Sequence, residues 1–506
     1  MAVKTIPKST ILLVAILLAV SSFPLAFFSG LFWDDWTMVW LYQNQGLMSL
    51  YALALQHAHV LYGPVASLPL FVDPEWSARL ALVLSLICRI SIALILVGII
   101  NFDGSRPFLA VAFAVFFLLT PLFDSRGILV VWHYDVFALA YIGSIWLSGV
   151  RGFAPKAVSV VLCLIGLSVE PLAALEPLRW WYLYNRSQSL PEAVSRSLPC
   201  FIAVIAYAIS KLTFYVPFGV YEGYNSVMFE PSSVIDNVVA NLIYVKYVAL
   251  QSLYAIRDFR YDSIWIIIIV IVTSFGVFLP LLKSRRSDLS VSTGLALAGL
   301  AVMLLGSIAV SAIGQVASVD HFSNRFAVAL QFGGALSLAA VVATLPSSVL
   351  RYSAASAAVF AFCVLNYQNA KWALLDSAVI ADFRQDIAVH LKDREPEVIW
   401  VEFEWNNSGD FYRRRCLSAN DMNVKLRMMI ETESFLYDLG CTKITETGVG
   451  NAWCMVSGRD RGPCPTRKEW LTFVIPENID RHYEISLPVL INAVRRENTN
   501  WGDLQY

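Results

Sequence analysis

The first 370 residues alternate between long apolar stretches and short polar ones. A helix needs about 20 apolar residues to cross a bilayer, and eleven stretches are candidates: 11–32, 79–100, 107–123, 128–147, 157–170, 172–184, 198–219, 263–282, 289–313, 326–344 and 352–368. The fifth and sixth are short and meet at Glu170 and Pro171, so they can form a re-entrant hairpin. If this hairpin does not cross the membrane, the number of crossings falls by two and stays odd. The pattern predicts an all-α polytopic membrane protein with about eleven transmembrane helices.

Lys and Arg in the loops predict the orientation, because they collect on the cytoplasmic side of a membrane. With the N-terminus inside, the cytoplasmic segments hold eleven of them: Lys4, Lys8, Arg106, Arg151, Lys156, Arg186, Arg196, Lys283, Arg285, Arg286 and Arg351. The short outer loops hold five: Arg126, Lys246, Arg257, Arg260 and Arg325. An odd number of crossings then places everything after residue 369 outside.

Residues 370–506 are richer in charge than the rest of the chain. Helix-like patterns near 376–393 and 420–438 flank an alternating stretch at 398–405, which favours a small soluble α+β domain. This tail has four cysteines, whereas the other four lie within apolar stretches. Disulfides form in oxidising compartments, so the split agrees with a tail outside the membrane, although three pairings are open. We expect domains at 1–369 and 370–506.

Two of the predicted outer loops are long enough to contain helices of their own. Residues 37–72 and 232–255 both combine aromatic side chains with sparse charge. This composition is typical of amphipathic helices that lie on a membrane surface. We therefore expect interfacial helices in both loops.

The composition agrees with a membrane protein and excludes other classes. Hydrophobic residues make up 57% of the chain, charged residues make up 15%, and the mean hydropathy is +0.61, whereas about a quarter of the residues in a soluble protein are charged. The net charge is −1 and no Lys or Arg cluster is present, which argues against nucleic acid as a partner. No glycine-rich phosphate loop, Ser-His-Asp order or HExxH run occurs.

Polar side chains that membrane burial disfavours fall mainly at the predicted outer ends of the helices. They are Asp34, Asp35, Asp124, Arg126, His133, Asp135, Glu170, Asp320, His321 and Arg325. Random placement would put as many of these polar side chains at the cytoplasmic ends of the helices. The asymmetry favours an outward-facing active site, although Asp124 and Arg126 could simply pair with each other.

Asp34 and Asp35 are the strongest catalytic candidates, because two adjacent carboxylates follow the first apolar stretch directly. Neighbouring side chains on a helix point about 100 degrees apart, so the two cannot hold the same substrate atom. One of them can act as general base for an attacking hydroxyl. The other can position a hydroxyl, Arg126 or a divalent cation. The alternative is that they only mark the end of the helix.

Arg325 is the main candidate for binding a phosphate, with Arg126 as a second. A guanidinium binds phosphate bidentately and stays charged, so it could stabilise a phosphate leaving group. The alternative is that Arg325 anchors its helix in the lipid headgroups. Trp33 and Trp36, like Trp132, would offer flat faces for sugar rings, but aromatic residues occur at every membrane interface.

The acidic motif Trp33-Asp34-Asp35-Trp36 in the first outer loop resembles that of the GT-C glycosyltransferases. Size, inside N-terminus, short hairpin at Glu170 and outside tail are similar to those of the Gtr-type serotype-converting glucosyltransferases of bacterial O-antigen. The resemblance implies an inner-membrane enzyme that moves a sugar, such as glucose, from undecaprenyl phosphate to a periplasmic polysaccharide with inversion. It also implies that Asp34 or Asp35 is the base, that Arg325 contacts the phosphate, and that the tail helps to seat the acceptor.

Two other functions fit a polytopic chain of this kind. An O-antigen polymerase or ligase would share the fold type and the outer-loop Arg residues. A lipid or sugar transporter or flippase would carry paired charges near the bilayer midplane and broken helices in related halves. The chain has one such break, at Glu170 and Pro171, and no matching break in its second half.

Overall fold

The computed structural model of the chain describes residues 7–26, 35–56, 59, 61–123, 128–129, 131–213, 217, 230–258, 264–282, 289–317 and 322–391, followed by five short strands. Beyond residue 370 only the backbone is described. The helices are α1 (Lys8–Ala26), α2 (Asp35–Gln45), α3 (Leu47–Gln56), α4 (Tyr62–Ala66), α5 (Pro74–Ile100), α6 (Pro107–Leu119), α7 (His133–Ser148), α8 (Phe153–Gly166), α9 (Glu176–Ser187), α10 (Leu190–Thr213), α11 (Pro231–Asp258), α12 (Ile264–Phe278), α13 (Leu289–Ser311), α14 (Val328–Thr344) and α15 (Ser348–Leu391). Short 3₁₀ helices are η1 (Leu68–Phe71), η2 (Glu170–Leu175), η5 (Leu279–Leu281) and η6 (Phe322–Ala327).

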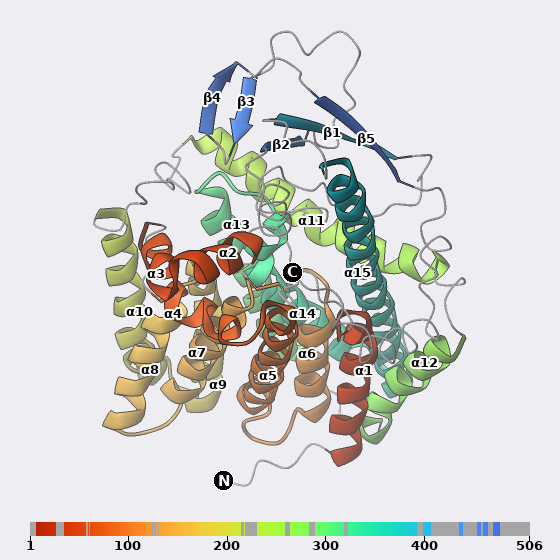
Figure 1. Cartoon of the computed structure of the whole chain (residues 1–506). Helices are drawn as coiled ribbons and strands as arrows, with labels where there is room; N and C mark the ends of the chain where they lie inside the picture. The colour runs from red at the N-terminus through yellow and green to blue at the C-terminus, as the bar shows by residue number, and fades with distance from the viewer. Residues whose placement is uncertain are drawn as a thin grey trace.

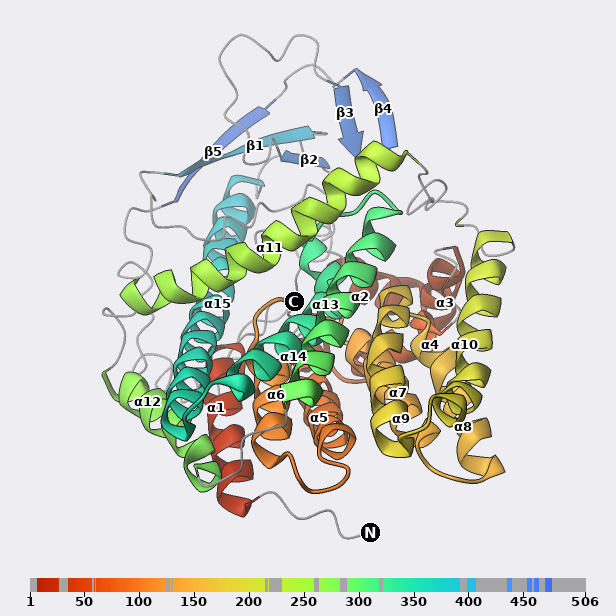
Figure 2. The same cartoon turned by 180° about the vertical axis from the view of Figure 1, so that it is seen from behind.

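Seven of the described helices are long and apolar enough to cross a membrane: α1, α5, α10, α11, α13, α14 and α15. These are the features of a multi-pass membrane protein. Six of the seven coincide with predicted crossings. The seventh, α11, covers the loop 232–255 that we expected at the membrane surface. Figures 1 and 2 show α11 running obliquely across α13 and α15, against which it packs.

Four consecutive helices, α6 to α9, are shorter than a full crossing requires, and α7 packs against α8. These helices have 13, 16, 14 and 12 residues, so they are about 18 to 24 Å long against a hydrocarbon core of about 30 Å. Pro121 explains one end: the preceding Thr120 takes an extended conformation, φ −62° and ψ 123°, and stops α6. Each of the four helices is therefore shorter than the hydrocarbon core is thick.

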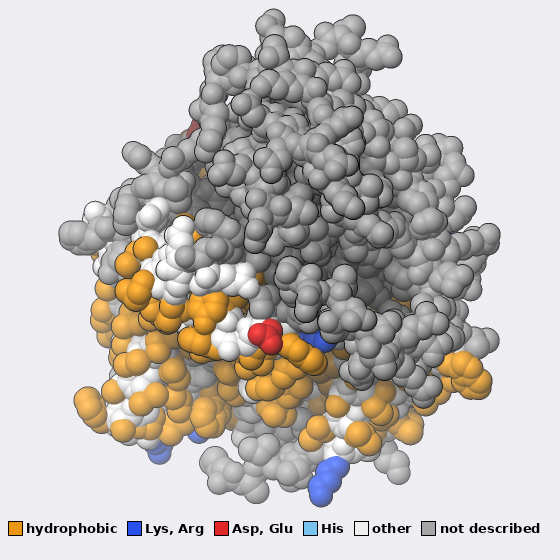
Figure 3. Space-filling view, in the orientation of Figure 1, with side chains coloured by type: hydrophobic (Ala, Val, Ile, Leu, Met, Phe, Trp, Pro, Cys, Tyr) orange, Lys and Arg blue, Asp and Glu red, His pale blue; other side chains and the backbone are white. Residues whose placement is uncertain are grey.

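Close packing of α13 against α14 forms the centre of the bundle. A Cβ atom on Gly333 would lie 2.6 Å from the carbonyl oxygen of Gly299, so glycine is required for the two backbones to approach this closely. On the face drawn in Figure 3 the described side chains are mostly hydrophobic. Outward-facing apolar side chains such as Leu94, Phe201 and Leu300 are what a lipid-facing surface needs.

The strands follow α15, which runs without a break across the predicted boundary at 369–370. β1 (Val398–Trp405) lies parallel to β2 (Phe435–Asp438) and β5 (Glu469–Ile475), and β3 (Trp453–Val456) is antiparallel to β4 (Arg459–Pro463). β1 occupies the alternating stretch predicted as a strand. The end of the helix predicted at 420–438 is wrong, because 435–438 form β2, and Phe435 and Tyr437 favour extended backbone. The α+β domain itself stays a prediction.

Candidate functional site

Two of the predicted substrate-binding residues, His133 and Glu170, belong to one cluster built around Tyr62. The Tyr62 ring stacks on His59 with 4.1 Å between centroids and an angle of 9°, and its centroid lies 4.4 Å from that of His133. His59 Nε2 lies 3.8 Å from Glu170 Oε1. These contacts bring α4, the start of α7 and η2 together. We call His59, Tyr62, His133, Tyr134, Glu170 and Lys211 the Glu170 cluster.

Lys211 completes the cluster from α10. Its Nζ lies 3.0 Å from Glu170 Oε1, so this lysine on an apolar helix pairs with a glutamate. The side chains are partly exposed, 19% for Lys211 and 39% for Glu170. Charges on apolar helices are costly and are usually retained where they are used. An ion pair that keeps access to solvent is therefore a candidate binding site.

The two rings beside this ion pair, His59 and Tyr62, are held in their neutral forms. Burial, and then the positive charge of Lys211, lowers the pKa of His59 well below its ordinary value. Burial, and then the neighbouring Tyr134, raises the pKa of Tyr62. Near neutral pH the cluster therefore contains a neutral imidazole and a protonated phenol beside the ion pair.

Asp135, another predicted substrate-binding residue, has intramolecular partners. It lies in the first turn of α7, where the helix dipole favours a carboxylate. Arg89 Nε donates to Oδ1 at 3.1 Å and to Oδ2 at 3.2 Å, and Ser85 Oγ donates to Oδ2. Both members of the ion pair are 3% exposed. The geometry makes Asp135 a link between α5 and α7, and its contact with a substrate stays a prediction.

The turn after α6 is held by side chains from four helices. Non-helical backbone at membrane depth requires such partners, and they are Asn366 to the Leu119 carbonyl (2.5 Å), Gln331 to the Phe117 carbonyl (2.6 Å), Tyr244 to the Leu122 carbonyl (2.6 Å) and Arg89 to the Phe123 carbonyl (3.2 Å). The Phe123 amide in turn donates to Gln331 Oε1 at 2.8 Å. Arg89 thus joins this turn to Asp135.

Arg325, the predicted phosphate ligand, lies in η6 at the entry to α14. Its guanidinium carbon is 4.7 Å from the centroid of the Phe326 ring. One turn further, Ala329 packs on Gly306 of α13, and a Cβ on Gly306 would also lie 3.8 Å from the Cβ of Ala174 in η2. The start of α14 and η2 therefore pack on the same point of α13. Arg325 lies four residues before Ala329, and Glu170 lies four residues before Ala174.

Several predicted residues lie outside the described residues: Trp33, Asp34, Asp124, Arg126, Asp320 and His321. Asp35 and Trp36 start α2, with only their backbone described. One turn on, Met38 and Val39 belong to a hydrophobic cluster with Trp132, the residue before His133. This hydrophobic cluster joins α2 to the start of α7.

Trp132 does not offer a face to a sugar. It is 1% exposed, and its Nε1 donates to the Ala66 carbonyl at 3.4 Å. The indole fills the space between α4, α5 and the start of α7, so its role is in packing. The expectation of a sugar-binding surface at Trp132 is wrong.

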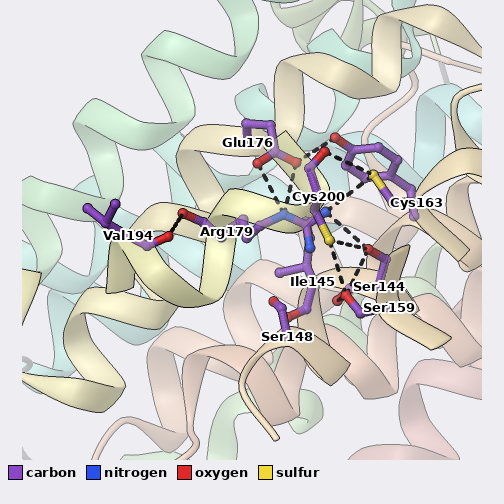
Figure 4. Close-up of polar contacts among 11 residues, drawn as sticks. Ser144, Ile145, Ser148, Ser159, Cys163, Glu176, Arg179, Val194 and Cys200 are labelled. Carbon is purple, nitrogen blue, oxygen red and sulfur yellow. Dashed lines mark hydrogen bonds and ion pairs between the residues drawn. The ribbon is translucent and has the colours of Figure 1, made fainter. Parts of the chain in front are cut away.

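A second polar cluster lies within α7 to α10 (Figure 4). Arg179 is fully buried, and its Nε donates to Glu176 Oε1 at 2.9 Å, while Tyr141 donates to the same oxygen at 2.7 Å. Arg179 Nη2 donates to Ser144 Oγ at 3.1 Å. Ser159 of α8 donates to the Ser144 carbonyl at 2.8 Å and lies 3.3 Å from Cys200 Sγ of α10, so the cluster ties α7, α8, α9 and α10 together.

Sequence reasoning missed His59, Tyr62 and Lys211 as members of the site. The signal that could have found them is the break at Glu170, whose carboxylate requires a cation. Among the described residues, no group of three or more His, Cys, Asp or Glu is placed to hold a metal ion.

Comparison with known proteins adds nothing to this geometry. No family model, no curated protein and no solved structure matches the chain. The resemblance to GT-C glycosyltransferases therefore stays an expectation from the motif at Asp34 and Asp35.

Proposed function

We propose that the chain is an inverting glycosyltransferase of the bacterial inner membrane. Its donor is a sugar, glucose in the first instance, carried on undecaprenyl phosphate, and its acceptor is a periplasmic O-antigen polysaccharide. The observation that carries the proposal is the Glu170 cluster. It combines an ion pair with access to solvent, a neutral histidine and two tyrosines between apolar helices.

The proposed reaction is a single displacement. An acceptor hydroxyl attacks the anomeric carbon as the bond from that carbon to the phosphate oxygen breaks, which inverts the configuration. Asp34 or Asp35 takes the hydroxyl proton, and undecaprenyl phosphate leaves with both electrons of the broken bond. Arg325, assisted by Arg126, stabilises the charge on this phosphate. His133 and Glu170 bind the sugar, with Trp33 and Trp36 beside it.

The orientation is part of the proposal. Lys and Arg predict a cytoplasmic N-terminus and a periplasmic active site. We keep the expectation that residues 232–255, within α11, lie along the membrane surface, so that the eleven crossings predicted from the sequence remain an odd number. The tail then forms a GT-C-type periplasmic α+β domain with disulfides among Cys416, Cys441, Cys454 and Cys464, and helps to seat the acceptor.

Mass spectrometry of the products tests the function. The full chain in nanodiscs is given undecaprenyl-phosphate glucose and a panel of O-antigen polysaccharides. The proposal expects one added hexose per repeat, with release of undecaprenyl phosphate. A change in chain length would instead indicate a polymerase, and movement of labelled donor across proteoliposomes without a covalent product would indicate a flippase. Either result would reject the proposal.

A further inference from the structure

The two carboxylate oxygens of Glu170 have different surroundings. Oε1 is 3.0 Å from Lys211 Nζ and 3.8 Å from His59 Nε2. Among the described residues, none donates a hydrogen bond to Oε2, and 39% of the side chain is exposed. A carboxylate can accept about four hydrogen bonds. Glu170 is thus anchored through one oxygen and has capacity left on the other.

The backbone around Glu170 fixes the direction of this carboxylate. Glu170 starts η2 after an extended residue, Val169, with φ −110° and ψ 90°, and is followed by Pro171. η2 packs against α13 and α14, with Ala174 close to Gly306. A group placed on a packed turn, rather than on a loose loop, can discriminate between substrates, because its geometry does not relax.

The chemistry of the free oxygen suits a hydroxyl group. An ionised carboxylate accepts short, strong hydrogen bonds from O–H donors. A phosphate would be repelled by the same charge, and an apolar chain would leave the oxygen without a partner. A sugar hydroxyl satisfies it.

We propose that Glu170 Oε2 accepts a hydrogen bond from one hydroxyl of the transferred sugar, and that Lys211 is a positioning residue that holds Oε1. This subsite rests on the proposed function, since it assumes a sugar donor. It goes further by assigning to Glu170 the choice between sugars that differ at one hydroxyl. A site built to bind a hydroxyl rejects the analogue that lacks it, because its own polar group loses its partner.

The test compares undecaprenyl-phosphate glucose with its 2-, 3-, 4- and 6-deoxy analogues, using the full chain in nanodiscs. The wild type is expected to show a kcat/KM at least about tenfold lower for one of the four analogues than for glucose. In Glu170→Gln the ratio for that analogue should approach one, because the charged acceptor is gone. A loss of activity in Glu170→Gln by the same factor for all five donors would overturn the proposal.

Glu192→Gln is the matched control. The Glu192 side chain is 37% exposed, and its Oε1 lies 2.5 Å from Arg196 Nη2, at the end of α10 opposite to Lys211. Glu192 therefore resembles Glu170 both in exposure and in having a cationic partner. It should keep the wild-type discrimination. Lys211→Gln should reduce the discrimination between the deoxy donors, and Lys211→Arg, which keeps the charge, should restore it. A purely structural role for Lys211 would lower expression or stability without changing this ratio.

If Glu170→Gln does not fold, Glu170→Asp provides the same test. The shorter side chain keeps the negative charge but moves both carboxylate oxygens away by the length of one methylene group. Selectivity unchanged from the wild type in Glu170→Asp would overturn the proposal. Failure of the proposed function has a different result: the wild type itself would transfer none of the five sugars. In that case the proposed subsite would be rejected together with the proposed function.

Discussion

Arg89 and Asp135 form a buried ion pair between α5 and α7, with Arg89 Nε 3.1 Å from Oδ1 and 3.2 Å from Oδ2. Arg89 also donates to the Phe123 carbonyl at 3.2 Å. One guanidinium therefore fixes the start of α7, where His133 lies, and the turn that ends at Phe123. The Glu170 cluster depends on this pair, because His133 contacts Tyr62 only if α7 starts where it does.

Removing one member of the pair should destabilise the protein strongly. Arg89→Met leaves the Asp135 carboxylate buried without its cation, which costs about 3 to 5 kcal/mol. Thermal unfolding in detergent would show a large fall in Tm, and the double variant R89M/D135L should recover most of it. Arg106→Met is the control: Arg106 is 3.5 Å from the partly exposed Asp103, and such pairs contribute at most about 1 kcal/mol. Equal effects of the two single substitutions would contradict this account.

Gln331 should control the local stability of the turn after α6. Gln331→Leu removes the partners of the Phe117 carbonyl and the Phe123 amide, at a cost of about 1 to 3 kcal/mol for each buried group left unpaired. Hydrogen exchange of the backbone amides at 117–123 should be faster in this variant. Ser307→Ala is the comparison, because the Ser307 hydroxyl donates only within its own helix, to the Met303 carbonyl. Unchanged exchange in Gln331→Leu would show that the turn does not depend on this amide.

The contact between α13 and α14 should tolerate no side chain at Gly333. Gly333→Ala would place a Cβ 2.6 Å from the Gly299 carbonyl oxygen and 2.6 Å from Met303 Cγ, so the helices must separate. We expect a loss of a few kcal/mol, about that of overpacking a core, seen as a lower Tm and reduced yield. In Gly98→Ala the new atom would lie 3.8 Å from its nearest neighbour, Trp146 Nε1, and stability should be nearly unchanged. A similar Tm for both variants would be evidence against the close packing.

His59 should make the protein less stable as the pH falls. Burial, and then the charge of Lys211, lowers the pKa of His59 in the folded state. The unfolded state therefore binds the proton more readily, and stability rises with pH. The contribution of the neutral ring is complete above the ordinary pKa near 6.5 and is lost as the pH falls toward the folded pKa. The Glu170 carboxylate faces the same ring and opposes this effect.

The measurement is Tm against pH between about 7.5 and 5. The wild type should lose more stability over this range than His59→Asn, which cannot titrate. Identical slopes for the two proteins would show that His59 is not held neutral.

The apolar pattern predicted most of the helices, because a lipid-facing helix must show a continuous apolar run of sufficient length. It failed for the lengths of α6 and α7, whereas it had predicted short helices where α8 and α9 lie. Stretches such as 107–123 remain apolar where they are buried in protein, and hydropathy does not distinguish burial in protein from burial in lipid. Only Pro121 marks the early end of α6 in the sequence. The sequence pattern also could not predict the oblique course of α11, because packing against α13 and α15 sets it.

The candidate site stays a prediction, although the structure brings two of its residues, His133 and Glu170, into one cluster. Sequence could not show that Asp135 pairs with Arg89, because the two are 46 positions apart and meet only through packing. His59 and Tyr62 were missed because aromatic residues in an interfacial loop are common, and only the stacking at 4.1 Å identifies this pair.

The central claim is that a carboxylate of the motif at 33–36 activates the acceptor hydroxyl for transfer. Asp34→Asn and Asp35→Asn keep the size of each side chain and remove the base. Sugar transfer from undecaprenyl-phosphate glucose should fall by about 10²- to 10⁴-fold in one of the two variants, while each variant keeps the wild-type Tm. Wild-type rates of transfer in both variants would contradict the account.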